Sequence, residues 1–125
     1  MSFDCISCEY NMMLINGALI GRRLNLSDEK VTQGEIAQYL DMADVRYSRE
    51  HRLGDGEIVD FLVADHIALE VKLRCPRKKI LRQLARYAVY ADVHMLILAS
   101  NTAIALPDQI QRKPVIGISL GKAWL

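Results

Sequence analysis

Residues 57–72 read EIVDFLVADHIALEVK, and this stretch decides the fold. The letters ADH at its centre separate two apolar runs that are typical of β-strands. A three-residue loop at this point pairs Val63 with Ile67 and brings Asp60 opposite Glu70. One face of the hairpin is then entirely apolar and carries Val59, Phe61, Val63, Ile67, Leu69 and Val71. A two-residue loop would mix apolar and charged side chains on both faces, so the hydrophobic pattern predicts the three-residue loop.

The opposite face of this hairpin carries Asp60, Glu70 and, one step further along the strand, Lys72. Two carboxylates and an ammonium group are costly to bury unless they are paired or bind a metal ion. A hard cation such as Mg²⁺ prefers carboxylate oxygens, and a water molecule bound to it becomes a usable nucleophile. The spacing alone leaves two interpretations open, a metal-dependent hydrolytic site or a salt-bridged polar face exposed to solvent.

The flanking sequence supplies the rest of a mixed fold. Ser27 has the chemistry of a helix N-cap and precedes acidic residues, which predicts a helix that ends near Met42. Pro76 suits the start of a second helix, which would run to about Tyr90. Further strands are expected over 45–53, 94–99 and 115–120, and an additional helix within 1–24. The resulting order, αβββαβ and a further strand, predicts an α/β or α+β fold with a mixed β-sheet flanked by helices.

The length of 125 residues is that of one domain. We therefore expect a single domain over 1–125, with its core at about 28–100 and an accessory or oligomerisation segment at 1–24. The longest apolar run is too short to span a bilayer and the N-terminus lacks the pattern of a signal peptide, so we expect a cytoplasmic protein. Cys5 and Cys8 have metal-ligand spacing, but no second pair follows, which favours free thiols over a zinc site.

The net charge of +1 conceals an uneven distribution of charged residues. Residues 1–65 hold 12 acids and 6 bases, whereas residues 66–125 hold 3 acids and 10 bases. Six of these bases fall within a stretch without acids: Arg74, Arg77, Lys78, Lys79, Arg82 and Arg86. Such a basic stripe indicates a phosphate-bearing partner, although a solvated helix face would have the same composition.

The spacing of the charged residues resembles that of the PD-(D/E)XK nuclease superfamily. Asp60 is followed after nine residues by Glu70-x-Lys72 on a predicted hairpin, and the similarity covers about residues 28–100. The resemblance implies a restriction-endonuclease-like core of order αβββαβ. It also implies that Asp60 and Glu70 bind Mg²⁺, with Mn²⁺ as a substitute, and that Lys72 assists the attacking water.

The same resemblance implies a further carboxylate in the site. In that superfamily a glutamate on the first helix often completes the acidic cluster, and Glu35 stands at the corresponding place. Glu50, on the strand before the hairpin, is its rival. The chain departs from the motif at Val59, where the family name has a proline that many members lack.

A second motif lies on the predicted helix after the hairpin. Gln83 and Tyr87 fit the Q-x-x-x-Y pattern of the RecB-type and Holliday-resolvase-like branches, and their spacing puts both on one side of a helix. By this resemblance the two residues brace Lys72 or contact the DNA backbone. An ordinary core tyrosine is the alternative for Tyr87. The whole pattern is also similar to small stand-alone nucleases of phages and bacteria.

Together these features predict a metal-dependent deoxyribonuclease, specifically an endonuclease in phage or bacterial DNA processing. A non-catalytic DNA-binding module or an inhibitor that keeps the nuclease fold is the alternative. The expected partner is DNA, because a basic stripe binds phosphates without reading sequence, but nothing separates DNA from RNA. The apolar N-terminal segment could support a homodimer, and the expected location is the cytoplasm of a bacterial cell or of a phage-infected host.

Overall fold

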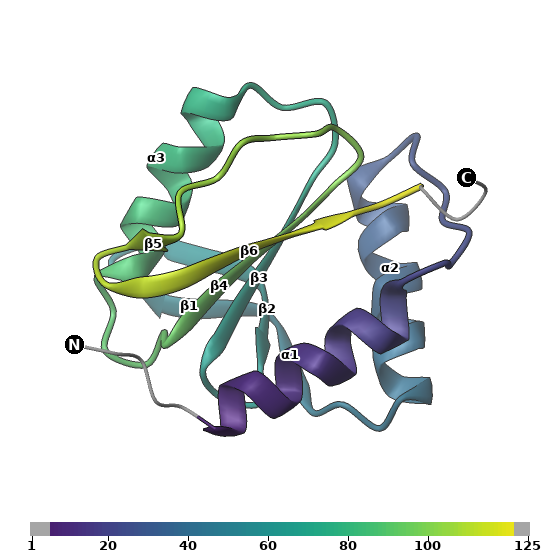
Figure 1. Cartoon of the computed structure of the whole chain (residues 1–125), viewed down its shortest axis with the longest axis horizontal. Coiled ribbons are helices and arrows are strands. Elements are labelled where there is room, and N and C mark those ends of the chain that lie inside the picture. Colours follow the sequence, from purple (N-terminus) through teal and green to yellow (C-terminus); the bar gives the residue numbers. More distant parts are fainter. Residues whose placement is uncertain (1–5, 122–125) are drawn as a thin grey trace.

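The computed structural model describes residues 6–121, which form an α+β fold with a mixed β-sheet (Figure 1). The elements are α1 (Ile6–Leu19), α2 (Glu29–Met42), β1 (Tyr47–Gly54), β2 (Glu57–Val63), β3 (Ile67–Lys72), α3 (Arg77–Ala88), β4 (Met95–Ser100), β5 (Gln109–Ile110) and β6 (Lys113–Ser119). From α2 to β4 the order is αβββαβ, which confirms the fold class predicted from the sequence. The short strand β5 was not predicted.

The six strands lie in the order β1-β2-β3-β4-β6-β5. The first three form an antiparallel meander, whereas β3, β4 and β6 run parallel to one another. Two adjacent parallel strands need a crossover connection, and α3 provides it between β3 and β4. The carboxyl ends of the three parallel strands therefore meet at one edge of the sheet.

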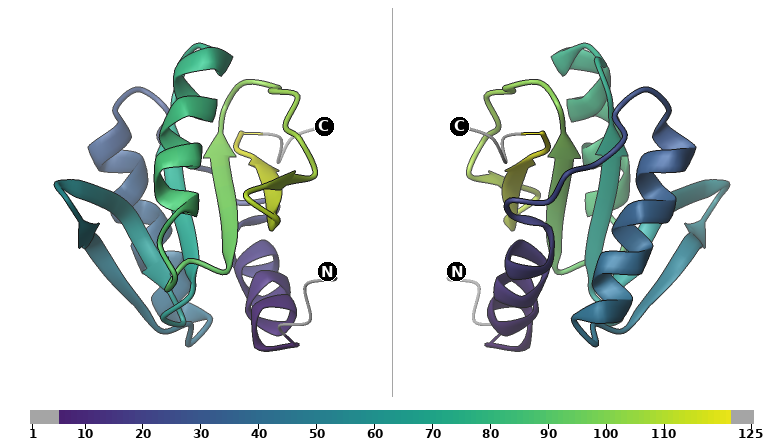
Figure 2. Two further views of the ribbon diagram at one scale, coloured as in Figure 1. Left: turned by 90° about the vertical axis from the view of Figure 1, so that its left-hand side faces the viewer. Right: turned by 90° about the vertical axis from the view of Figure 1, so that its right-hand side faces the viewer.

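Helices cover the two faces of the sheet in separate layers (Figure 2). On one face α1 and α2 contribute Ile15 and Ile36 to a buried cluster that includes Phe61. On the other face α3 contributes Ile80 and Leu84 to a second cluster. This arrangement buries the apolar stripes of the helices on both faces of the central strands, as a layered fold requires. None of the helices within 6–121 has the length and apolar composition needed to cross a membrane.

The hairpin has the register that the hydrophobic pattern predicted. Val63 pairs with Ile67 and Phe61 pairs with Leu69, so the loop contains three residues. The ladder between β2 and β3 ends at Phe61, and the β1–β2 hairpin leans away from the rest of the sheet beyond this point (Figure 2). Val59 consequently packs in the cluster under α3 rather than with Phe61, so its predicted face was wrong. The alternation of faces fails because the strand twists where its pairing with β3 ends.

The ends of the helices agree with the sequence within a few residues. Asp28 rather than Ser27 is the N-cap of α2, and its carboxylate accepts hydrogen bonds from the main-chain N–H groups of Lys30 and Val31. Serine and aspartate are both good N-caps, so the sequence alone could not show which of these two adjacent residues begins the helix. The helix α1 confirms the predicted helix within 1–24, although Cys5 lies outside the described residues.

Candidate active site

The candidate site lies where β2 and β3 separate. The main-chain N–H of Asp60 donates a hydrogen bond to Glu70 Oε1 at 3.1 Å. The main-chain N–H of Val71 donates in return to Asp60 Oδ2 at 2.8 Å. Each carboxylate therefore satisfies a main-chain group of the neighbouring strand in place of the missing ladder bonds. The two acids predicted to lie opposite each other are brought together in this way.

Burial leaves the carboxylate of Glu70 with little solvent to stabilise its charge, and Asp60 is half-buried beside it. Glu70 is 3% exposed, and burial, followed by the charge of Asp60, raises its pKa to about 7. Burial also raises the pKa of Asp60 above its usual range, against the hydrogen bond from Val71. Lys72 Nζ lies 3.7 Å from Glu70 Oε2, so one cation lies beside the buried Glu70 and the half-buried Asp60. The site has an excess of negative charge, which a bound cation would relieve.

Tyr87 supports this pair from the helix α3. The side chain is 1% exposed, and its hydroxyl donates a hydrogen bond to the carbonyl oxygen of Ile58 at 2.9 Å. Burial, followed by the charge of the nearby Glu70 carboxylate, raises the pKa of Tyr87. The burial of Tyr87 leaves no surface for contact with DNA. Bracing of Lys72 stays a prediction, and burial is equally what an ordinary core tyrosine would show.

The structure separates the candidates for a third carboxylate. Glu35 Oε1 accepts a hydrogen bond from the main-chain N–H of Asn25 at 2.6 Å. Glu29, in the first turn of α2, accepts one from the main-chain N–H of Leu73 at 2.9 Å, directly after β3. The charge of Glu29 is among those that raise the pKa of Asp60. Sequence reasoning missed Glu29, although its place next to the N-cap of the helix was visible.

Glu50 occupies an unusual position in β1. The pairing of its neighbours Arg49 and His51 places it opposite Asp60, and its φ of 47° is in the left-handed region. A non-glycine residue there is strained at a cost of about 1–3 kcal/mol. The Glu50 carboxylate pairs with Lys30 Nζ at 2.7 Å, on the exposed surface. The choice among Glu29, Glu35 and Glu50 as the third site residue stays a prediction.

The basic stripe borders the site through α3. Lys72, Lys79, Arg82, Gln83 and Arg86 line a hollow of about 240 Å³. The bases of α3 lie on its exposed side because Ile80, Leu84, Tyr87 and Ala88 occupy the buried side. Arg74, the one base of the stripe outside α3, is also exposed, and both Arg74 and Arg77 contact neighbouring loops. Arg74 donates from Nη2 to the carbonyl oxygen of Leu26 at 3.4 Å, and Arg77 donates from Nε to that of Ala105 at 2.6 Å. Arg86 pairs with Glu57 at 3.1 Å, and Lys78 is exposed.

The donor set of the site suits a hard divalent cation. Mg²⁺ commonly takes one or two protein carboxylates and completes its shell with water and phosphate oxygens. Asp60 and Glu70 supply two such groups, and burial, the main cause of their raised pKa values, disfavours a charge that a bound cation would stabilise. Among residues 6–121 no three His, Cys, Asp or Glu side chains gather as a ready-made set of ligands. Cys8 and Cys75 belong to clusters on opposite faces of the sheet, so these two thiols cannot share a zinc ion.

Comparisons with protein-family models, curated proteins and solved structures found no match to this chain. The resemblance to the nuclease superfamily therefore rests on the motif residues and on their geometry.

Proposed function

We propose that this chain is a Mg²⁺-dependent deoxyribonuclease that hydrolyses phosphodiester bonds within a DNA strand. One observation carries the proposal: a buried carboxylate, Glu70, and a half-buried one, Asp60, each accept a main-chain hydrogen bond from the other's strand, with Lys72 beside them. Among the described residues the two acids make one ion pair between them, that of Glu70 with Lys72. The order of elements and the Asp60, Glu70-x-Lys72 spacing support membership of the PD-(D/E)XK superfamily.

Each residue has a defined part in this proposal. Asp60 and Glu70 would hold the cation, which would lower the pKa of a water molecule and offset charge that develops on the phosphate. Lys72 would orient the attacking water through its ammonium group, which Glu70 holds at 3.7 Å. Tyr87 would keep Glu70 in position, because its side chain is buried and its hydroxyl donates a hydrogen bond to the carbonyl oxygen of Ile58 in β2.

The basic side of α3 would hold the DNA backbone. The hollow that Lys79, Arg82 and Gln83 line also includes Lys72, so a phosphate bound there would lie next to the reacting group. Contacts of this kind depend on salt and do not read sequence. They favour a nuclease that cuts a broad range of sequences.

The test is cleavage of labelled linear, circular, single-stranded and branched DNA with Mg²⁺, Mn²⁺ or EDTA. We expect metal-dependent cutting by the wild type, including cutting of circles, and a loss of about 10²–10⁴-fold in kcat for Lys72→Met. Lys79→Met is the matched control, because it removes the same charge from the same hollow and should raise KM with little change in kcat.

Two results would contradict the proposal. Absence of cutting on every substrate by folded wild type would do so, and salt-dependent binding in that case would point to the non-catalytic DNA-binding module. Equal kcat values for wild type and Lys72→Met would contradict the role of Lys72 in orienting the attacking water, even if cutting were observed.

A further inference from the structure

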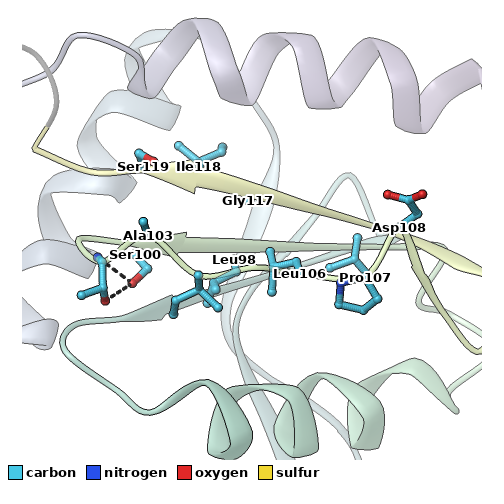
Figure 3. Close-up of a pocket in the computed structure, with 12 residues that line it drawn as sticks. Leu98, Ser100, Ala103, Leu106, Pro107, Asp108, Gly117, Ile118 and Ser119 are labelled. Atoms are coloured by element: carbon cyan, nitrogen blue, oxygen red, sulfur yellow. Dashed lines mark hydrogen bonds between the residues drawn. The ribbon is translucent and has the colours of Figure 1, made fainter.

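A second cavity lies two strands away from the candidate site. It has a volume of about 370 Å³ and opens between β4, β6 and the segment 101–108 (Figure 3). Its size falls in the range of roughly 300–1,000 Å³ that is typical of small-molecule sites. Leu98, Leu106 and Pro107 give it apolar walls, whereas Ser100, Thr102 and Ser119 give it hydroxyl groups.

The cavity exists because β6 loses its outer partner. The main-chain N–H of Val115 donates to the carbonyl oxygen of Asp108 at 3.0 Å, and in the described part of the chain the pairing of β6 on this side reaches no further. Main-chain groups alternate in direction along a strand, so those of Gly117 and Ser119 face the same side as those of Val115. The cavity therefore offers main-chain donors and acceptors along one wall.

The same cavity is connected to the candidate site by the sheet. Lys72 pairs with Ser100 and Ser100 pairs with Ser119 at the carboxyl ends of the three parallel strands. Two strand spacings amount to about 10 Å, so one nucleic-acid strand could contact both the candidate site and the cavity. In open sheets of this kind ligands bind outside the carboxyl ends of the parallel strands.

The basic segment that leaves β3 also holds the outer wall of the cavity. The main-chain N–H of Arg74 donates to Asn101 Oδ1 at 3.0 Å, and Arg77 Nε donates to the carbonyl oxygen of Ala105 at 2.6 Å. The second bond uses one of the three guanidinium nitrogens of Arg77. The other two nitrogens remain able to bind an anion beside the segment 101–108, which forms the outer wall of the cavity.

The lining indicates the chemistry of the ligand. No lysine or arginine is among the described residues that line the cavity, so its interior does not suit a phosphate. The one carboxylate of the lining, Asp108, lies at the opposite end from Ser100 (Figure 3). Apolar walls, hydroxyl groups and main-chain hydrogen-bonding groups together suit an uncharged, flat heterocycle whose phosphate lies outside, toward Arg77.

We infer that this cavity holds one unpaired nucleobase of the strand being cut, and that Arg77 binds the phosphate of the same nucleotide. The inference rests on the proposed nuclease function and narrows its substrate. A base inside a duplex cannot enter the cavity without leaving its stack. The preferred substrates are therefore single strands, frayed ends and branch points with an unpaired nucleotide beside the cut.

The first experiment measures binding apart from cleavage. The four deoxynucleoside 5′-monophosphates and deoxyribose 5-phosphate are titrated in turn into the labelled wild-type protein, and amide NMR shifts are followed. We expect at least one mononucleotide to bind ten-fold or more tightly than the sugar phosphate, with the largest shifts within 98–119.

Variants of the protein then test where the base binds. Gly117→Val fills the cavity: a Cβ there meets only Leu106 Cδ1, at 3.1 Å, and that side chain can move. Ala103→Phe fills the cavity from the exposed outer segment and serves if Gly117→Val does not fold. Both variants should abolish the preference for the mononucleotide. Arg77→Ala should weaken binding ten-fold or more, whereas Arg46→Ala, which removes an exposed arginine paired with Asp65, should not.

The outcomes separate this inference from the proposed function. Equal binding of mononucleotide and sugar phosphate, or binding that survives both filled variants, overturns the base site, even if the wild type cuts DNA. Base binding that both variants abolish supports the site. If wild type with Mg²⁺ nevertheless cuts no DNA, the nuclease proposal fails, and with it the link between this base and a cut.

Discussion

Glu29 and Leu73 join the first turn of α2 to the end of β3 by a hydrogen bond of 2.9 Å from the main-chain N–H to the carboxylate. Leu73 directly follows Lys72, and Glu29 acts electrostatically on Asp60. One side chain of the helix thus fixes the strand that carries Glu70 and Lys72 and adds negative charge to the site.

We expect Glu29→Gln to lower kcat by about ten- to hundred-fold, the range typical of groups that orient the ligands of a metal site. Glu35→Gln and Glu50→Gln are the matched controls, since they remove the same charge at Asn25 and at Lys30. We expect each to leave kcat within about three-fold of wild type. Steady-state cleavage rates at saturating DNA measure the effect, and a larger loss in Glu35→Gln than in Glu29→Gln would contradict the assignment.

Glu70→Gln should increase the free energy of unfolding at alkaline pH while it abolishes cleavage. The folded-state pKa of Glu70, about 7, is above the unfolded value of 4.5, so the folded state binds more protons between these values. Stability is therefore lost as pH rises from 4.5 to 7, and above 7 the charged Glu70 disfavours folding by on the order of 1–3 kcal/mol. Urea unfolding at pH 5 and pH 8.5 measures the difference, which should be seen only at pH 8.5. A variant less stable than wild type at pH 8.5 without Mg²⁺ would refute this.

The salt dependence of DNA binding should reflect the basic side of α3. The double variant Lys79→Gln, Arg82→Gln should lower the slope of log K against log salt by about 1.4–1.8, because each phosphate contact contributes about 0.7–0.9. The matched control is the double variant Arg46→Gln, Arg112→Gln, which removes two positive charges at the opposite end of the strands. The measurement uses a catalytically inactive background with several salt concentrations. An unchanged slope in the α3 variant would exclude this helix from the interface.

His66 and His94 form a second pH-sensitive feature where the hairpin loop meets β4. Their rings stack at 3.9 Å with an interplanar angle of 3°, and the main-chain N–H of His94 donates to the carbonyl oxygen of His66 at 2.8 Å. Burial, followed by the charges of His66 and Lys113 and against that of Asp92, lowers the pKa of His94 below 6.5. The stability that this lowered pKa contributes is present above pH 6.5 and is lost as pH falls through the folded-state value.

The variant His94→Phe keeps a ring and removes this titration. We expect the stability difference between wild type and His94→Phe to shift against the wild type as pH falls from 7.5 to 5, measured by urea unfolding. The difference is the correct readout because Glu70 titrates in the opposite direction over part of this range. A difference independent of pH would show that the stacked pair does not respond to protons.

The sequence was most informative in the hairpin, where the apolar pattern of the strands and the length of the turn had to be consistent with one register. The apolar residues of the hairpin fit one register, and the turn length fixed that register, so the neighbourhood of Asp60 and Glu70 could be derived without coordinates. The helix α3 could also be predicted from the sequence, because its apolar residues lie on one side of the helix and its basic residues on the other.

Packing decided the features that the sequence could not predict. Glu29 and Glu35 are both on α2, and only the way in which the helix lies against β3 brings Glu29 to Leu73. The twist that moves Val59 to the other cluster arises from the end of a ladder, which no local pattern indicates. The two-residue strand β5 depends on β6 for its pairing and has no pattern of its own.

The reciprocal bonds of Asp60 and Glu70 constrain how this protein could evolve. Each carboxylate is also the acceptor for a main-chain N–H of the other strand, so in the proposed nuclease the same side chains would serve both chemistry and architecture. A descendant that abandoned catalysis could neutralise both positions but would still need acceptors there, because an unpaired buried N–H costs about 1–3 kcal/mol. Asparagine and glutamine would meet that need, whereas alanine would not. An inactive lineage of this fold would therefore keep the outline of its former active site in amide form.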